Sequence, residues 1–598
     1  MTTTSTSSVT MRSKTTGPWT PSDAKTSGRR GRQLEARARQ SVSRRRAACG
    51  QHRASHHRPS REKIVAGRAK LGIILLLKPR VRLQSNWIMA TFHLLNFGCR
   101  ASQADGVALK GQLLAAGLEE APSAERSDLA VLNTCTVTAT ADAEVRRVIR
   151  RIHRTNPRCR ILVTGCYAQR APHEIAGLEG VAWVVGNSHK HAVVELLKAG
   201  PGKGVGQDSI RGPSDVLPQE SHRAATGVPG QAQLEPRRAA PKASGADVRS
   251  HDDAKGWLEA ASSEASAAGR RAEVLVGAVS DEFHFVPVSA RHRADDRTRP
   301  TLKIQDGCNA RCSFCIIPYV RGGSRSLAPD LVIQQVHALE DQGYKEIVLS
   351  GINLGSYGRD LDRSITFLGL LEQILAETSI ARLRISSIEP MDVTSELIHL
   401  AASEPRLARH FHIPLQSGCD RILRLMNRRY WTSQYRERVL AIHEQIPNCG
   451  LGADVMVGFP GETDQDHAAS LRFIETLPFT YLHIFPYSAR PSTPAAASAS
   501  QVDGRVSRER GQEIRGVIGE KRQRFLDAQV GRALSVLTLD EVGDPGQPPE
   551  RGAEAGGRAL SSNYLEVALP GSDLPPNTLV DVRVARAAPG LLYGYPEG

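Results

Sequence analysis

The sequence predicts a mixed α/β protein with an N-terminal parallel α/β sheet domain, an incomplete (β/α)6 barrel and a small C-terminal all-β barrel. Two stretches of the chain alternate short apolar strands with amphipathic helices, which is typical of parallel sheets. A third stretch, near the C-terminus, contains only short strands separated by Gly and Pro, as small β-barrels do. With 598 residues, the chain is long enough for several domains with cores of their own.

Residues 1–88 carry the excess positive charge. They hold 20 Lys and Arg against 3 Asp and Glu, a net charge of +17, whereas the rest holds 58 against 59, a net charge of −1. The pI of 9.6 therefore says nothing about the folded part. The apolar run "LGIILLL" is much shorter than the roughly 20 residues of a membrane helix, so we expect no membrane contact. We interpret residues 1–88 as a disordered basic extension from an overlong gene start before Met89; a transit peptide is the alternative.

The first folded domain is expected over residues 89–200, where strands and helices alternate. Its strands are expected at residues 91–98, 128–134, 160–165 and 181–186, and its helices at 102–116, 141–154 and 189–198. Residues 201–290 are then dominated by Gly, Pro, Ala, Ser, Arg and Gln, which predicts a largely disordered linker. Within it, the apolar stretch "AEVLVGAV" is a candidate for rejoining folded structure.

The alternation resumes in a second domain, expected over residues 291–525. Strands are expected at residues 301–305, 346–351, 382–388, 410–415, 452–458 and 481–487, and helices near 330–341, 367–377, 394–402, 433–446 and 464–477. A complete barrel of this kind needs eight strand–helix steps. Six steps predict an incomplete one. Residues 526–590, with "ALSVLTLD", "NYLEVALP" and "TLVDVRVAR", predict a small β-barrel of a type that often binds nucleic acid.

The ten cysteines are too dilute for a disulfide scaffold, which favours a reducing compartment. Cys99, Cys135 and Cys166 each follow one of the first three predicted strands. Because the carboxyl ends of parallel strands meet at one edge of a sheet, we expect these thiols to share a metal cluster. The alternative is that each is a small buried residue. Cys159 precedes its strand and is not counted as a ligand.

Three more cysteines, Cys308, Cys312 and Cys315, follow the first barrel strand in "CNARCSFC". A structural zinc site normally takes four protein ligands, so zinc would need Cys419 or a histidine as the fourth. A [4Fe–4S] cluster has four irons, and three thiolates leave one of them open for a substrate or cofactor. The absence of a fourth thiol in this loop therefore favours an iron–sulfur cluster with a function.

This C-x3-C-x2-C spacing after a first barrel strand resembles the radical S-adenosylmethionine (SAM) superfamily. Further motifs resemble its methylthiotransferases: "FGCRASQADG", "LNTCTVTATAD" and "TGCYAQR" in the first domain, and "HIPLQSG", "DVMVGFPGET" and "FPYSARPSTPA" in the second. The C-terminal module resembles the TRAM domain, an RNA-binding β-barrel. The resemblance implies two [4Fe–4S] clusters, one held by Cys99, Cys135 and Cys166 and one by Cys308, Cys312 and Cys315. Two departures are a longer linker and Cys419, where a serine is expected.

The resemblance also implies the chemistry. An aromatic C–H carbon of adenine has no acidic proton, so acid–base catalysis cannot place sulfur there, and a cofactor-derived radical can. One SAM molecule would give a methyl group to a sulfur on the first cluster. Another would be cleaved at the second cluster, and the methylthio group would replace hydrogen at carbon two of the adenine. Positions at strand ends and in the cysteine loop predict contacts with SAM for Phe314, Ser350, Gly351, Gln416 and Gly458. Glycines there also suit plain turns.

Within this family, "RLRISSIEP" and "LSGINLGSYG" are similar to the subgroup that acts on threonylcarbamoyladenosine next to the tRNA anticodon. Glu389 is the candidate substrate-reading residue; the alternative is a solvent-facing Glu before Pro390. Siblings that act on isopentenyladenosine or on a ribosomal-protein aspartate remain alternatives. A non-catalytic iron–sulfur RNA-binding protein is the alternative from another class.

The expected partner is the anticodon stem–loop of tRNA, which an RNA-binding barrel can recognise by shape and phosphates. Arg321, Arg325, Arg428 and Arg429 are predicted phosphate contacts, with solvated surface arginines as the alternative. An unidentified electron donor and a sulfur source would complete the partners. The expected localisation is the cytoplasm.

Overall fold

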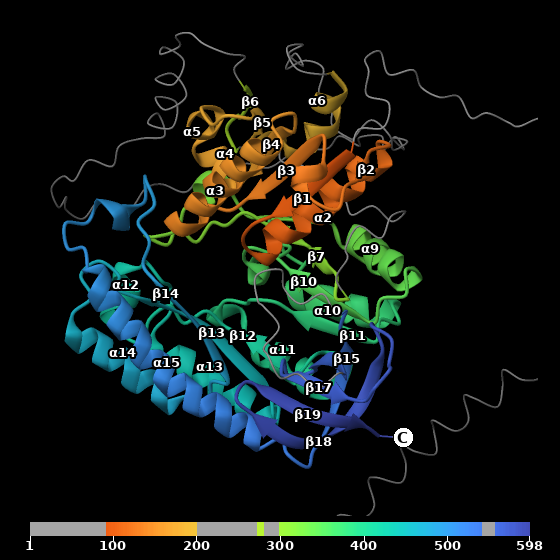
Figure 1. Ribbon diagram of the computed structural model, residues 1–598. Coiled ribbons are helices and arrows are strands. Elements are labelled where there is room, and N and C mark those ends of the chain that lie inside the picture. Colours follow the sequence, from red (N-terminus) through yellow and green to blue (C-terminus); the bar gives the residue numbers. More distant parts are fainter. Residues whose placement is uncertain (1–90, 200–271, 280–297, 541–555, 598) are drawn as a thin grey trace, which may run out of the picture. The chain divides into compact units, whose positions relative to one another are not determined.

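The computed structural model describes residues 91–199, 272–279, 298–540 and 556–597 (Figure 1). The predicted extension and most of the predicted linker lie outside these residues. Within the described part, the fold has the three predicted components: a parallel N-terminal sheet, a central six-stranded (β/α) unit and a closed C-terminal barrel. No helix in the described ranges combines the length and the apolar character needed to cross a membrane.

The N-terminal sheet has the strand order β2-β1-β3-β4-β5-β6, and every pairing in it is parallel. Its strands are β1 Thr91–Asn96, β2 Glu119–Glu120, β3 Leu129–Thr134, β4 Arg160–Gly165, β5 Val181–Val185 and β6 Glu273–Leu275. Its α-helices are α2 Arg100–Ala115, α3 Ala139–Thr155, α4 Cys166–Arg170, α5 Pro172–Ala176 and α6 Val193–Ala199. The last strand comes from "AEVLVGAV", so this part of the predicted linker does rejoin folded structure.

Helices cover both faces of this sheet, which explains why β3 is buried along its whole length. Leu129 and Val131 of β3 pack with Leu109 and Leu113 of α2 on one face. Ala130 and Leu132 alternate with them and pack with Val145, Ile149 and Ile152 of α3 on the other. Buried on both sides, β3 loses the alternation of a half-exposed strand.

The central unit contains the six predicted strands. They are β7 Thr301–Lys303, β10 Glu346–Ser350, β11 Arg382–Ile385, β12 His410–His412, β13 Gly450–Val457 and β14 Tyr481–Pro486. They form two parallel sheets, β7-β10-β11 and β12-β13-β14, joined by parallel bridges from Leu383 to Leu407 and from Ser387 to His412. In the described residues β7 and β14 are not paired, as expected for an incomplete barrel.

The helices of this unit follow its strands in alternation. They are α8 Ile317–Val320, α9 Pro329–Asp341, α10 Phe367–Glu377, α11 Ser395–Ser403, α12 Asp420–Leu425, α13 Thr432–Gln445, α14 Asp464–Thr476 and α15 Gly504–Asp527. In β13, Leu451, Ala453 and Val455 belong to the large apolar core shared with these helices. Side chains alternate along a strand, so Asp454 and Met456 face the other way, into the barrel.

The C-terminal barrel closes in the order β15-β16-β17-β19-β18. Its strands are β15 Ala533–Thr538, β16 Gly556–Ser561, β17 Glu566–Pro570, β18 Leu579–Ala588 and β19 Leu591–Pro596. It contacts the beginnings of the central strands: Arg384 of β11 donates to the carbonyl oxygen of Ser562 (3.0 Å), and the ring of Tyr564 lies 4.5 Å from that of His410. The cysteine loop lies after β7, at the opposite ends of these strands.

Candidate functional site

The loop with three cysteines begins directly after the first barrel strand. A two-stranded antiparallel pair, β8 Gln305–Asp306 and β9 Arg325–Ser326, closes its base. Gly307 has φ +67°, and a Cβ there would lie 1.8 Å from the carbonyl oxygen of Gly323. Only glycine allows this crossing. Cys308, Cys312 and Cys315 follow, all three half-buried.

These three thiols are neighbours, and nearby N–H groups point at their sulfurs. The Sγ of Cys308 accepts the N–H of Ala310 at 3.4 Å, and that of Cys312 accepts Nη1–H of Arg428 at 3.3 Å. Burial raises the pKa of Cys315 to about 12, with Cys312 and Cys308 adding to the effect. Adjacent sulfurs supported by N–H donors suit an iron–sulfur cluster, whose positive irons would replace the thiol protons. The residues of this loop therefore fit such a group.

The other three predicted thiols lie at one edge of the N-terminal sheet. Cys99 precedes the first residue of α2, Cys135 follows β3, and Cys166 begins α4 directly after β4. Burial, together with the nearby Cys166 and Cys99, raises the pKa of Cys135 to about 12. A Cβ at Gly98 would lie 2.7 Å from the Sγ of Cys135, so glycine lets the chain before Cys99 pass this thiol. These residues could hold a second cluster.

Cys159 lies elsewhere, as its place before β4 predicted. Its thiol is 3.7 Å from the hydroxyl of Ser127 and packs in the core under α3. The thiol of Cys419 donates to Asp466 at 3.2 Å. Cys49 lies outside the described residues.

The two groups of cysteines lie next to each other. Cys166 packs in one small apolar cluster with Ile316 and Ile317, and Cys308 and Cys315 pack against the same cluster. Segments 142 residues apart in the chain, at Cys166 and Cys308, thus line one region. The structure brings both candidate cluster sites to the carboxyl ends of their strands, where α/β proteins place their chemistry.

A buried network of charged residues joins the two domains behind these thiols. Asp105 of α2 pairs with Lys190 (3.0 Å), with Lys303 of β7 and with Arg321 (2.9 Å). Asp306 pairs with Lys303 (2.7 Å) and with Arg321 (2.9 Å). All five side chains are less than a tenth exposed. Burial alone would raise the pKa of Asp306, but Arg321 and Lys303 outweigh it and lower the pKa to about 2.

This network contains three cations and two carboxylates, so one positive charge is left over. Arg321 brings positive charge next to a thiol, because its Nε–H donates to the Sγ of Cys166 at 3.2 Å. The prediction that Arg321 contacts RNA phosphates is therefore wrong: its side chain is fully buried and its guanidinium is already bonded to Asp105 and Asp306. Asp105, Lys190 and Lys303 were not predicted from the sequence, although a lysine inside an apolar strand, as in "TLKIQD", is a signal for a buried charge with a partner.

Arg428 is also buried rather than on the surface. It lies between Glu389, with which it forms an ion pair, and the Sγ of Cys312. A side chain only 6% exposed cannot serve as a surface phosphate contact. Burial raises the pKa of Glu389, against the opposing effect of Arg428. Arg325 is half-buried and donates to the carbonyl oxygen of Arg321 at 2.7 Å, whereas Arg429 is exposed.

Among the residues predicted to contact SAM, Phe314 lies in the cysteine loop and the others lie at or beyond strand ends, and Gln416 is the most unusual of them. It has φ +62°, a conformation that costs free energy for any residue except glycine, and its buried Oε1 has no hydrogen-bond partner among the described residues. Strain and an unpartnered polar atom in one residue are typical of a ligand site. Phe314 packs edge-on against Phe459, with ring centroids 6.4 Å apart.

Three further residues predicted to contact SAM end strands. Ser350 is the last residue of β10 and is buried. Gly351 follows it, and a Cβ there would lie 2.9 Å from Oε1 of Gln305. Gly458 has φ +70°, and its N–H donates to Glu462 at 2.7 Å.

Two family models match the chain. Residues 91–186 match "Uncharacterized protein family UPF0004", and residues 302–474 match the radical SAM superfamily. The threonylcarbamoyladenosine tRNA methylthiotransferase MtaB of Aquifex aeolicus is 32% identical over 470 residues, covering 79% of this chain and 94% of that protein. The chain belongs to the radical SAM methylthiotransferase family. It is therefore a transferase whose family uses SAM and a [4Fe–4S] cluster.

Other relatives are similar over comparable lengths. The enzyme of the same name from Bacillus subtilis is 32% identical, covering 85% of this chain and 96% of that protein. A tRNA-2-methylthio-N(6)-dimethylallyladenosine synthase from Natranaerobius thermophilus is 29% identical, covering 84% and 96%. Among solved structures, a radical SAM methyltransferase from Kitasatospora setae has a TM-score of 0.43 at 16% identity, covering 68% of this chain and 74% of that one.

Proposed function

We propose that this methylthiotransferase adds a methylthio group to carbon two of threonylcarbamoyladenosine, next to the anticodon of tRNA, by a SAM-derived radical mechanism. One observation carries the proposal: two groups of three cysteines, from different domains, lie beside one apolar cluster. A single group would suffice for SAM cleavage or for a structural cluster. Two adjacent groups suit a reaction that needs a radical and a sulfur source in one place.

In this proposal, Cys308, Cys312 and Cys315 hold the cluster that binds SAM, and Cys99, Cys135 and Cys166 hold the second one. When bound, these groups supply one-electron cleavage of SAM and the sulfur to be transferred. The chain's own residues bind and orient the ligand. Phe314 offers an aromatic face to the adenine of SAM, and Gln416 offers its unpartnered amide oxygen to a donor on the ligand. Ser350, Gly351 and Gly458 let backbone atoms approach the ligand.

Arg428 is a positioning residue in this scheme. Its guanidinium joins Glu389 to Cys312, so a substrate contact made by Glu389 is held in a fixed place relative to the cysteine loop. In this proposal Glu389 contacts a polar group of the threonylcarbamoyl substituent, and this contact would distinguish the substrate from isopentenyladenosine, whose substituent is apolar. The polar surroundings of Glu389 favour the first substrate.

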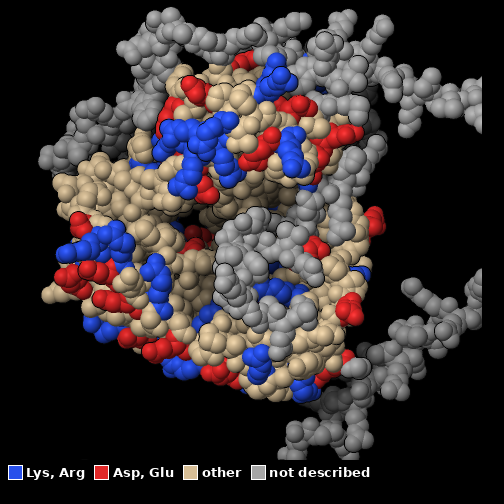
Figure 2. Space-filling view, in the orientation of Figure 1, with Lys and Arg blue, Asp and Glu red and all other residues tan. Residues whose placement is uncertain are grey.

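A basic helix face supports binding of tRNA near the site. Arg147, Arg150, Arg151 and Arg154 of α3 are exposed and lie at i, i+3, i+4 and i+7, on one side of the helix. Lys and Arg gather over this helix in Figure 2. The helix begins four residues after Cys135. Its arginines would bind phosphates of the tRNA backbone near the candidate site.

The C-terminal barrel would act as a TRAM-like RNA-binding module. On its β18–β19 pair, the Cζ of exposed Arg586 lies 3.3 Å from the ring centroid of Tyr593, and Arg583 pairs in register with exposed Tyr595. Arginines alternating with aromatic rings suit the stacking of unpaired bases. We place the enzyme in the cytoplasm with its tRNA, with an electron donor and a sulfur source still to be identified.

The decisive test is mass spectrometry of tRNA nucleosides from cells with and without the gene. We expect 2-methylthio-threonylcarbamoyladenosine to disappear in the deletion strain and to return with the intact gene but not with a Cys312→Ala variant. If only the isopentenyl counterpart disappeared, the substrate would be wrong and the chemistry right. If neither nucleoside changed, the protein-modifying and non-catalytic alternatives would take its place.

A further inference from the structure

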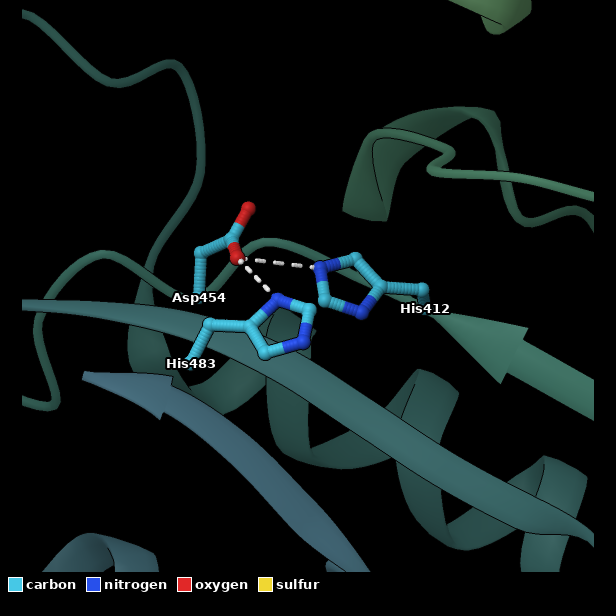
Figure 3. A group of neighbouring side chains, drawn as sticks. All are labelled: His412, Asp454 and His483. Carbon is cyan, nitrogen blue, oxygen red and sulfur yellow. Dashed lines mark hydrogen bonds and ion pairs between the residues drawn. The ribbon is translucent and has the colours of Figure 1, made fainter. Parts of the chain in front are cut away.

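Three side chains inside the barrel converge without taking part in the site above. His412 on β12, Asp454 on β13 and His483 on β14 point at one another (Figure 3). The Oδ1 of Asp454 lies 3.1 Å from Nε2 of His412 and 3.2 Å from Nδ1 of His483. One ligand atom from each residue lies within 4.8 Å of the other two. Two imidazoles and a carboxylate at this spacing form a candidate metal centre.

The strand register explains why these residues meet. His412 is paired with Gly452, two residues before Asp454, and Asp454 is paired directly with His483. All three lie on the inner side of adjacent parallel strands, because the intervening residues Phe411, Ala453 and Ile484 pack with the outer helices. The backbone therefore fixes the group, and no loop has to close to assemble it.

A second layer of contacts orients His412. Its Nδ1 lies 3.0 Å from the hydroxyl of Tyr481, which is also 2.7 Å from Nε2 of His410. Gly452 makes room for that ring, since a Cβ there would lie 2.0 Å from Cζ of Tyr481. A ligating histidine is usually held in this way, by a hydrogen bond to the ring nitrogen that does not bind the metal.

The group is open on one side. The His412 side chain is 7% exposed, that of Asp454 25% and that of His483 61%. A cation bound here would have protein ligands on its inner side and free coordination positions toward solvent. Three protein ligands with open positions are the pattern of sites where a metal binds a further molecule.

We propose that His412, Asp454 and His483 bind one divalent transition-metal cation, with Zn²⁺ and Fe²⁺ as the best matches to a donor set of two nitrogens and one oxygen. The alternative is a hydrogen-bonded group in which both imidazoles donate to the carboxylate. A bound cation would make this patch of the barrel wall positive, and its open positions would then accept a carboxylate or phosphate oxygen. This proposal does not depend on which nucleoside the enzyme modifies.

The test uses the full-length, cluster-loaded protein dialysed to equilibrium against Zn²⁺, with zinc and iron measured separately by mass spectrometry. We expect one zinc per chain above the iron of the clusters. His483→Asn and Asp454→Asn should lose it while keeping their iron. Tyr481→Phe should weaken zinc binding about 10-fold, because it removes only the orienting bond. His443→Asn, an exposed histidine on α13, is the matched control and should keep the zinc.

Two results would overturn the proposal: no zinc above the background of dialysis buffer, or equal zinc in the wild type and in His483→Asn. The second would place the metal on the cysteines. Because His483 is largely exposed, its replacement should leave the fold intact, and iron content with far-ultraviolet circular dichroism checks this. His483→Gln serves as a second variant at the same position.

Discussion

At the scale of single residues, Arg321 links the charge network to the candidate site. It bonds two carboxylates from different domains and a cysteine sulfur, all within 3.2 Å. The six cysteines could be predicted to lie at the carboxyl ends of strands, because each group follows strands that the local sequence pattern predicts. The sequence could not place Arg321, because the direction of a loop side chain depends on partners such as Asp105, 216 residues away.

Replacing Arg321 by Met should destabilise the protein strongly. The change leaves Asp105 and Asp306 with fewer positive partners in a buried place, and breaking a buried pair costs about 3–5 kcal/mol. Unfolding by urea under anaerobic conditions measures this loss. Arg325→Met is the control, since Arg325 is half-buried and its guanidinium bonds backbone carbonyls. Equal effects of the two substitutions would contradict a special role for the network.

Replacing Cys312 by Ala should remove one cluster and leave the other. We expect the iron content to fall to about half and reductive SAM cleavage to stop, because three thiolates are the minimum set for this cluster. Iron analysis and release of 5′-deoxyadenosine measure the two effects. Cys449→Ala, at a buried thiol outside both groups, should keep all the iron. Full iron content in Cys312→Ala would show that this loop does not hold a cluster.

At the scale of elements, α15 supports a turn at the candidate site. Its Arg510 donates to Oε2 of Glu462 at 2.6 Å, and the same oxygen accepts the N–H of Gly458. Helix α15 was not predicted from the sequence, because it is mostly polar and buries only a narrow stripe of residues that includes Ile514 and Ile518. The alternating elements were predictable because their apolar residues repeat with a clear period.

Gly458→Ala should therefore destabilise the turn in two ways. A non-glycine residue at φ +70° costs about 1–3 kcal/mol, and the added Cβ would lie 1.9 Å from the hydroxyl of Ser507 on α15. The double variant Gly458→Ala/Ser507→Gly should recover the part due to the clash, and a urea double-mutant cycle separates the two. Full recovery would show that the backbone conformation carries no cost. No recovery would exclude the contact with α15.

At the scale of the whole molecule, charged side chains hold the domains together. Glu346 of β10 bonds Arg384 (2.7 Å) and Arg382 (3.3 Å), and both arginines reach backbone or side-chain oxygens of the C-terminal barrel. Burial alone would raise the pKa of Glu346, but Arg384 and its neighbours lower it to about 2. The sequence predicted the fold class with its three components. It could not predict these contacts, because each joins strands more than 150 residues apart in the chain.

This lowered pKa predicts a pH dependence of stability. The stabilisation by Glu346 is complete above the pKa of an unfolded glutamate, near 4.5, and is lost as the pH falls toward 2. The difference in unfolding free energy between wild type and Glu346→Gln should shrink by about 1 kcal/mol between pH 6 and pH 3.5. Exposed Glu437 offers the control Glu437→Gln, whose difference should stay constant. A constant difference for Glu346→Gln as well would contradict the lowered pKa.

The arrangement of charge over the molecule predicts where tRNA binds. Outside residues 1–88 the net charge is −1, yet α3 presents a row of exposed arginines. Reversing two of them, Arg150→Glu/Arg154→Glu, should weaken tRNA binding and lower the slope of log Kd against log salt by about 1 to 2, because each lost phosphate contact releases one counterion fewer. Fluorescence anisotropy with intact tRNA across a salt series measures both quantities.

The control Arg508→Glu/Arg515→Glu makes the same charge change at exposed positions of α15 and should leave the slope unchanged. Equal loss in both variants would mean that net charge alone governs binding. An unchanged slope in the α3 variant would move the RNA contact to the C-terminal barrel, where Arg586→Ala would then carry the effect.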